Sequence, residues 1–194
     1  MDPILFPTRQ SSITLQDITS NNWHSIIRLV VNKDQLTLVP PNVESLCEHQ
    51  FHPLSIVRAI YADSTPVGYI RLQQDAVNEQ EEQRQGQVAY RLQCFMIDQA
   101  CQGLGFGTKA LVALQDQLVA QAAASSTTTK VKTTTGADSC SNDSATTATA
   151  LTIKVSTTPF ATVHSDDSPE HFFATVGFTK GITGKEMVWV PRSL

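Results

Sequence analysis

The chain has 194 residues, a length that suits one domain with a sizeable core and leaves little room for a second. Hydrophobic residues make up 41% of it and charged residues 16%, a composition that excludes a largely disordered chain. The formal net charge is -4, and the 14 lysines and arginines form no run, so we expect no nucleic-acid partner.

The cysteines and the N-terminal residues bear on metals and on the compartment. No two cysteines form a CxxC pair, and no cysteine and histidine share zinc-ligand spacing, so no metal is predicted. Cys94 lies in an apolar run and is expected to be a reduced core residue. Residues 1–10 show no signal-peptide pattern, and no apolar stretch approaches the length of a membrane span. We therefore expect no membrane partner and a cytoplasmic protein, with the nucleus left open.

Periodicity and turn residues predict a series of strands and helices along the chain. Strict alternation of apolar and polar residues indicates strands, while apolar residues three and four apart indicate helices. Trp23 falls at such a helical spacing and is expected in the core. In chain order the sequence predicts a strand over 13–18, a helix through 23–31, a short helix over 43–49, a strand over 56–61, a turn at 63–66, a strand over 67–72, a Gln- and Glu-rich loop over 73–87, a strand over 87–97, a helix over 108–123, a strand over 151–155, a helix over 169–176, and two closing strands over 178–182 and 186–190.

Residues 122–150 consist mostly of alanine, serine and threonine. Such a tract cannot bury enough apolar surface to offset the entropy lost when it is ordered. We therefore predict a flexible insertion within a single domain that spans residues 1–194.

A glycine-rich loop, Gln102-Gly103-Leu104-Gly105-Phe106-Gly107, stands between the strand over 87–97 and the following helix. Glycines let the backbone turn tightly and approach a ligand closely. The first N–H groups of a helix have no intrahelical acceptor, and the helix dipole adds partial positive charge there. The order of strand, loop and helix therefore predicts a cradle for an anion such as a pyrophosphate, to which Thr108 could add a hydroxyl donor.

Other interpretations of this loop remain open. One is a turn of purely structural use. A dinucleotide-binding fingerprint is another, because Gly105-x-Gly107-x-x-Ala110 fits its relaxed form, but the acidic residue expected about 20 positions later would fall in the Ser- and Thr-rich tract. A P-loop requires Gly-Lys-Ser/Thr after the glycines, whereas here Gly107 is followed by Thr108-Lys109.

The loop and its preceding strand resemble a known family. Phe95-Met96-Ile97-Asp98 followed by Gln102-Gly103-Leu104-Gly105-Phe106-Gly107-Thr108 resembles the coenzyme A signature of the GNAT N-acetyltransferases. It is most similar to the bacterial-type diamine and spermidine/spermine acetyltransferase branch. Three further segments agree with it: Gln35 with Val39, Asn42 and Ser45; Val67-Gly68-Tyr69-Ile70; and Phe172-Phe173-Ala174-Thr175-Val176-Gly177-Phe178.

This resemblance implies an α/β (α+β) fold with a mixed, largely antiparallel sheet of about seven strands, flanked by about four helices. The fourth and fifth strands would splay apart, and the pantetheine arm of acetyl-coenzyme A, the co-substrate, would pair with β-strand backbone between them. The resemblance assigns cofactor contacts to Phe95, Met96, Ile97, Gln102, Gly103, Leu104, Gly105, Phe106, Gly107, Thr108 and Phe173.

The catalytic positions of the family are substituted in this chain. The tyrosine that commonly protonates the thiolate corresponds to Phe173, and a glutamate that accepts the amine proton in some polyamine-acetylating members corresponds to Gln93. Three accounts remain open. Water could serve as acid and base, or Asp98, His164 or Glu170 could substitute, or the domain could bind acyl-coenzyme A without turnover.

The acceptor site is predicted from one pair of carboxylates. Glu44 and Glu48 lie four residues apart on one face of the short helix, where they could attract a dication or form an ordinary solvated face. We therefore predict an N-acetyltransferase that transfers acetyl to a primary amine, a small polyamine-like acceptor first. The alternatives are a non-catalytic acyl-coenzyme A-binding module and a nucleotide-dependent protein. The resemblance is compatible with a homodimer.

Overall fold

The computed structural model describes residues 6–75, 87–127, 150–156 and 169–191. Its strands form one seven-stranded sheet with the order β1-β2-β3-β4-β5-β7-β6, in which only β4 and β5 run parallel. This mixed, largely antiparallel sheet confirms the predicted fold class. The strands are β1 (Ile13–Gln16), β2 (Ser55–Ala62), β3 (Thr65–Gln74), β4 (Gln87–Ile97), β5 (Ala150–Ser156), β6 (Thr179–Lys180) and β7 (Glu186–Trp189).

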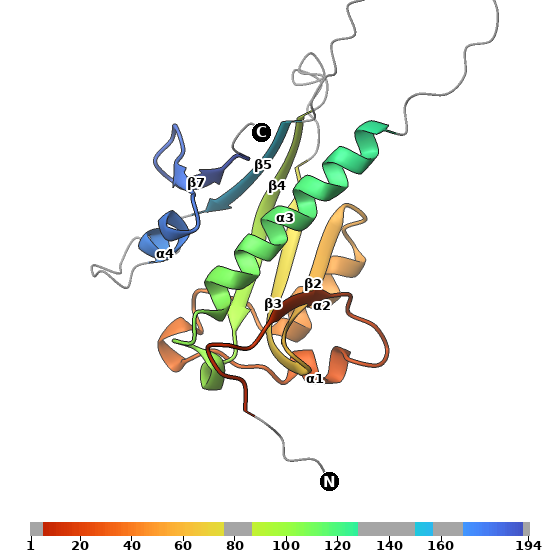
Figure 1. Cartoon of the computed structure of the whole chain (residues 1–194), viewed down its shortest axis with the longest axis vertical. Helices are drawn as coiled ribbons and strands as arrows, with labels where there is room; N and C mark the ends of the chain where they lie inside the picture. The colour runs from red at the N-terminus through yellow and green to blue at the C-terminus, as the bar shows by residue number, and fades with distance from the viewer. Residues whose placement is uncertain (1–5, 76–86, 128–149, 157–168, 192–194) are drawn as a thin grey trace, which may run out of the picture.

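Helices cover both faces of the sheet. The long helix α3 lies across one face in Figure 1, and its apolar residues join those of the strands and of α4 in one core. A second, smaller core lies where α1 and α2 pack on β2, β3 and β4. The helices are α1 (Trp23–Ile27), α2 (Asn42–Gln50), α3 (Phe106–Thr127) and α4 (Pro169–Thr175), with two 3-10 turns, η1 (Lys33–Gln35) and η2 (Gln99–Cys101).

Strand β4 contains a β-bulge and then separates from β5. Arg71 of β3 pairs with Cys94 and Leu72 pairs with Leu92, so Gln93 is the extra residue. On the other side, β4 pairs with β5 only from Gln87 to Leu92, whereas its pairing with β3 continues to Ile97. Within the described ranges, residues 93–97 therefore have no strand partner on the β5 side, and the pairing ends where the predicted splay between the fourth and fifth strands would begin.

The first helix is shorter than predicted, because its C-terminal end is drawn toward the residues that follow β4. The α-helix ends at Ile27, and Val30 lies outside any helix or strand. The backbone N–H of Val30 donates to Asp98 Oδ2 (3.0 Å), and the Val30 carbonyl accepts from Gln99 N–H (2.7 Å). The prediction for Trp23 was wrong: its side chain is 38% exposed, because a five-residue helix buries one narrow face that Ile26 occupies.

Strand β3 and helix α3 are each longer at both ends than predicted, and β3 extends to Gln74, inside the loop predicted over 73–87. Strand β3 begins at Thr65, inside the predicted turn, because Asp63 adopts a left-handed conformation (φ 53°) that closes a two-residue hairpin. Helix α3 begins at Phe106 and continues to Thr127. The first residues of the predicted insertion are therefore helical, since the alanines at 122–124 are strong helix formers. Residues 128–149 lie outside the described residues, and their flexibility stays a prediction.

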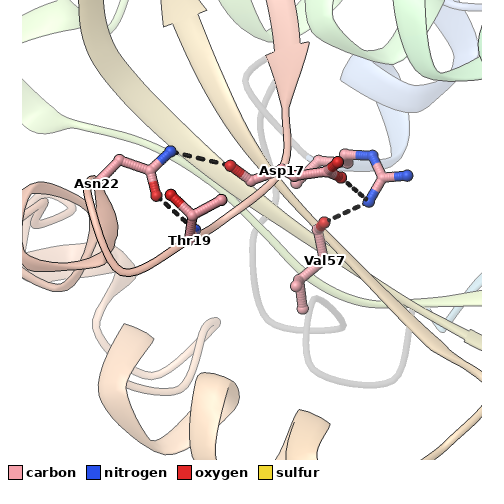
Figure 2. A network of polar contacts seen from close by, with 5 residues as sticks. Asp17, Thr19, Asn22 and Val57 are labelled. Atoms are coloured by element: carbon pink, nitrogen blue, oxygen red, sulfur yellow. Dashed lines mark hydrogen bonds and ion pairs between the residues drawn. The ribbon is translucent and has the colours of Figure 1, made fainter.

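Polar contacts hold the chain where β1 leads into α1. Figure 2 shows Asn22 bridging two residues: its amide donates to the Asp17 carbonyl (2.9 Å) and accepts from the Thr19 N–H (2.7 Å). Arg58 of β2 forms an ion pair with the Asp17 carboxylate (2.9 Å) and donates to the Val57 carbonyl (2.8 Å). These contacts lie away from the site described next.

Candidate functional site

The glycine loop is fixed by the side chain of Gln102. Its amide nitrogen donates to the Ile97 carbonyl (2.9 Å) and to Gln35 Oε1 (2.8 Å), and its amide oxygen accepts from Asn32 (2.7 Å). One side chain thus connects the end of β4, the loop and the segment around η1. Asn32 was not among the predicted site residues.

Two glycines of the loop adopt conformations that other residues rarely take. Gly103 has φ 73° and Gly105 has φ 80°, both in the left-handed region. The Gly105 carbonyl accepts from the Lys109 N–H (3.2 Å), so this glycine caps α3. The next N–H groups of the first turn have no intrahelical acceptor, and the first turn holds no acidic side chain. The loop therefore has the backbone geometry of an anion cradle.

The lysine next to the loop does not serve that cradle. Lys109 Nζ donates to the carbonyls of Arg9 (2.7 Å) and Ser11 (3.1 Å), and the Arg9 guanidinium donates to the Gly103 carbonyl (3.0 Å). In a P-loop the lysine must reach the phosphates, whereas Lys109 anchors the segment before β1 to the loop. The structure therefore does not support the P-loop interpretation, because Lys109 is engaged elsewhere.

A cavity of about 570 Å³ runs from the loop along the unpaired part of β4. A ligand there can lie along backbone that lacks a strand partner and can reach the start of α3. Most of the predicted cofactor residues line this cavity, namely Phe95, Met96, Ile97, Gln102, Gly103, Gly105, Phe106, Gly107, Thr108 and Phe173. Leu104 does not line it and packs instead against the core under α3.

Aromatic rings from α4 close one wall of the cavity. Phe172 stacks on Phe95 with ring centroids 5.8 Å apart, and Phe173 meets Phe172 edge-on at 5.2 Å. A Cβ added at Gly107 would lie 3.2 Å from the Phe172 ring, so glycine allows this close contact. Phe173 is 4% exposed, lines the cavity and carries no proton to donate. Phe172 was quoted in the resemblance but was not predicted as a site residue.

The substituted base position and the three predicted substitutes lie in different places. Gln93 lines the cavity at the bulge and is exposed. The Asp98 carboxylate is occupied by the backbone N–H groups of Val30 and Ala100 (both 3.0 Å), which makes it a structural cap rather than a free base. Glu170 does not line the cavity and lies 3.6 Å from Lys180 Nζ, and His164 lies outside the described residues.

The two carboxylates predicted for the acceptor do not form a free pair. Glu48 is bound to Arg71 Nη1 (2.6 Å), a buried guanidinium that also donates to the Ser45 carbonyl (3.1 Å). Neither Glu44 nor Glu48 lines the cavity. The expectation of paired charges fails for Glu48, because an arginine 23 residues away in sequence neutralises it. Glu44 is exposed, and its role stays a prediction.

The titratable side chains on the cavity wall are few. Within the described part of the chain they are Arg91 and the two cysteines Cys94 and Cys101. Burial is the main cause that raises the pKa of the Cys94 thiol, to about 11, and burial also raises the pKa of Cys101. Both thiols are therefore neutral near pH 7. Cys94 is 2% exposed and makes no disulfide, as predicted.

The segment around η1 supplies an apolar wall that the sequence did not reveal as part of the site. Val31, Leu38 and Val39 line the cavity beside Met96 of β4.

Over the residues that the structure describes, no group of three or more His, Cys, Asp and Glu side chains could hold a metal ion. No helix in these same ranges combines the length and apolarity that crossing a bilayer requires.

Comparisons with known proteins identify the fold. No protein-family model and no curated protein matches the sequence. Among solved structures, a tyrosine-to-phenylalanine mutant of the AtaT toxin, bound to the C-terminus of the antitoxin AtaR and acetyl-CoA, matches with a TM-score of 0.57. The two chains are 12% identical, and the match covers 92% of each.

Two further solved structures give similar matches. The ribosomal-protein-S18-alanine N-acetyltransferase from Escherichia coli has a TM-score of 0.52 at 11% identity, over 92% of this chain and 94% of that one. A Desulfovibrio desulfuricans protein assigned to the GNAT family has a TM-score of 0.51 at 13% identity, over 93% and 98%. With its splayed strands and glycine loop, the chain therefore has the fold of the GNAT acetyltransferases.

Proposed function

We propose that this protein transfers an acetyl group from acetyl-coenzyme A to a primary amine. The observation that carries the proposal is the continuous cavity of about 570 Å³ that joins the anion cradle at 102–108 to the unpaired backbone of β4. A long ligand with a pyrophosphate at one end and amide groups along its arm fits this combination. The solved AtaT complex, which has the same fold, contains acetyl-CoA.

The binding mode follows from the backbone. The pyrophosphate would accept from the free N–H groups at the start of α3, and the pantetheine amides would pair with β4 at 93–97 in place of β5. The thioester then lies near the start of the splay, beside Gln93 and Phe173. Because β5 leaves β4 there, the thioester carbonyl is accessible to an amine.

The reaction forms one C–N bond and breaks one C–S bond. A neutral amine attacks the thioester carbonyl, the tetrahedral intermediate collapses, and coenzyme A leaves as a thiolate. The amine nitrogen loses one proton and the thiolate gains one. Since Phe173 and Gln93 cannot exchange protons and Asp98 is occupied, we assign both transfers to water in the open cavity.

The polyamine-like acceptor has no support from the carboxylates that suggested it, because Glu48 is paired with Arg71 and Glu44 lies outside the cavity. The proposed function is therefore limited to a primary amine. A cytoplasmic location and a homodimer also stay predictions.

A second candidate function is acyl-coenzyme A binding without turnover, which is favoured by Phe173 at the position of the family's acid. Thiol release from acetyl-coenzyme A over a panel of amines separates the two functions. We expect release that depends on amine concentration. Tight acetyl-coenzyme A binding without any amine-dependent release would establish the binding module instead.

Thermal unfolding with candidate ligands tests the cofactor independently of turnover. A ligand that binds only the folded state raises the melting temperature with its concentration. We expect a shift with acetyl-coenzyme A and none with NAD or ATP. The opposite pattern would support the nucleotide-dependent alternative and contradict the proposal.

A further inference from the structure

Charged side chains are scarce on the described cavity wall, and their sign bears on which acceptor the cavity can bind. Among the described residues that line it, the only charged side chain is Arg91, and none is a carboxylate. A dicationic acceptor would need carboxylates to replace the hydration of its second charge. The charged side chain that the described lining does hold is a cation, which favours an acceptor that carries a negative charge.

A second hollow, of about 190 Å³, adjoins this end of the cavity. Arg91 and Ser156 line both hollows, so the two are contiguous. The other residues of the second hollow are Lys154, Thr183, Lys185 and Glu186. Its wall therefore contains three cationic side chains and one carboxylate, that of Glu186. The hollow is a basic extension of the cavity.

Arg91 and Lys154 are held side by side by the sheet. They are direct partners in the parallel pairing of β4 and β5, one residue before the pairing ends, on neighbouring strands in Figure 1. Asp75 lies 3.4 Å from Arg91 Nε and 3.6 Å from Lys154 Nζ, and its backbone N–H donates to the Ala89 carbonyl (2.9 Å). The carboxylate orients both cations and balances one of their two charges. Asp75 contacts the guanidinium of Arg91 at Nε. Within the described ranges, no contact is found to the two Nη groups of Arg91.

The position of Arg91 separates it from the cofactor's pyrophosphate. Ile97, the last residue before the loop region, is six residues further along β4, which corresponds to about 20 Å at ~3.3 Å per residue. The bulge at Gln93, where the thioester is placed, is two residues away, or about 7 Å. An anion at Arg91 therefore belongs to the acceptor and not to coenzyme A.

We propose that the acceptor is an amine that carries an anionic group, a carboxylate or a phosphate, which Arg91 and Lys154 bind while the amine lies at the start of the splay. This inference rests on the proposed function and names its substrate class. Arginine suits the role because its planar fork binds carboxylate or phosphate oxygens in pairs.

Amines of matched length provide the test. Butylamine, 4-aminobutanoate and 1,4-diaminobutane share a four-carbon chain and differ in the charge at its far end. Ethanolamine and O-phosphoethanolamine form the phosphate pair. With acetyl-coenzyme A saturating, kcat/KM is compared per unprotonated amine. We expect an anionic amine to exceed its neutral counterpart by about twofold to fivefold, the range for an exposed ion pair, and 1,4-diaminobutane to be the poorest acceptor.

Substitution of the arginine assigns the preference to this site. Arg91→Gln should remove the advantage of the anionic amines over their neutral counterparts. Arg91→Glu should favour 1,4-diaminobutane instead. Arg58→Gln is the matched control, because Arg58 also forms an ion pair with an aspartate but lies on β2 outside both hollows. It should leave the order of acceptors unchanged. Thermal unfolding confirms that each variant is folded.

The outcomes separate this inference from the proposed function. Equal use of all amines, or a preference for 1,4-diaminobutane in the unmodified protein, overturns the inference while turnover itself stands. If no amine drives thiol release, the proposed function fails, and binding to the acetyl-coenzyme A-loaded protein decides the inference. Saturation-transfer NMR should then detect 4-aminobutanoate with the unmodified protein and lose it with Arg91→Gln. No signal with either protein overturns the inference.

Discussion

The two ends of the cavity are built in different ways. At the loop end, the chemistry comes from backbone: two glycines with positive φ, the free N–H groups of α3 and the unpaired part of β4. At the splayed end it depends on side chains, and those at the family's acid and base positions, Phe173 and Gln93, cannot transfer protons. The comparison teaches that backbone conformation and side-chain chemistry are specified separately at the two ends of one cavity.

The loop end gives the largest expected effect. Gly105→Asp forces a side chain onto a residue with φ 80° and places a carboxylate where the pyrophosphate would lie. We expect acetyl-coenzyme A affinity to fall by at least about 100-fold, measured by titration calorimetry. Gly184→Asp is a matched control, because Gly184 also has positive φ (66°) but lies in the turn before β7. Unchanged affinity in Gly105→Asp would place the pyrophosphate elsewhere.

A tyrosine at the splayed end should supply the proton donor that this end of the cavity lacks. Phe173→Tyr restores a hydroxyl at the position from which the family commonly protonates the thiolate, and its side chain lines the cavity. We expect kcat to rise about tenfold, a modest share of what general acids contribute, because the hydroxyl is not optimally placed. Phe178→Tyr adds the same hydroxyl to a buried ring outside the cavity and should not raise kcat. A lower kcat in Phe173→Tyr would argue that thiolate protonation is not limiting.

Loss of the contacts between the glycine loop and the segment around η1 should have a smaller effect than the two substitutions above. Gln102→Ala removes three side-chain hydrogen bonds, to Asn32, Gln35 and Ile97. We expect stability to fall by about 2 kcal/mol and the KM for acetyl-coenzyme A to rise severalfold. Chemical denaturation and steady-state kinetics measure the two effects. Gln99→Ala, at an exposed position of η2, is the control that should change neither.

The smallest effect is expected from the titration of protein groups on the described cavity wall. Cys94 has a pKa raised to about 11 by burial and the pKa of Cys101 is also raised, so both thiols stay protonated between about pH 6 and 8. No described group on the cavity wall should then add an inflection. We expect log kcat/KM to rise with a slope of one up to the pKa of the amine, as attack requires the neutral amine. An inflection that stays at one pH for amines of different pKa would reveal a catalytic group on the protein.

The sequence predicted the backbone features of the site better than its side-chain partners. Glycines at alternate positions between an apolar strand and a periodic helix determine the local conformation of 102–108 almost alone. The role of Asp98 could not be predicted in this way, because its carboxylate is bound by Val30, 68 residues away. Glu48 is a similar case, since its partner Arg71 lies on a strand that local pattern does not place beneath α2. Arg91 carries no motif, and its pairing with Lys154 depends on the register of two strands.

The bulge at Gln93 has a consequence for how readily this protein can change. Leu92 belongs to the core under α3 and Cys94 to the core under α1 and α2. The two residues therefore face opposite sides of the sheet, as consecutive residues of a regular strand do, although Gln93 lies between them. Gln93 itself is exposed and belongs to neither core. A residue beside the proposed reaction centre can therefore be substituted with little expected cost to folding.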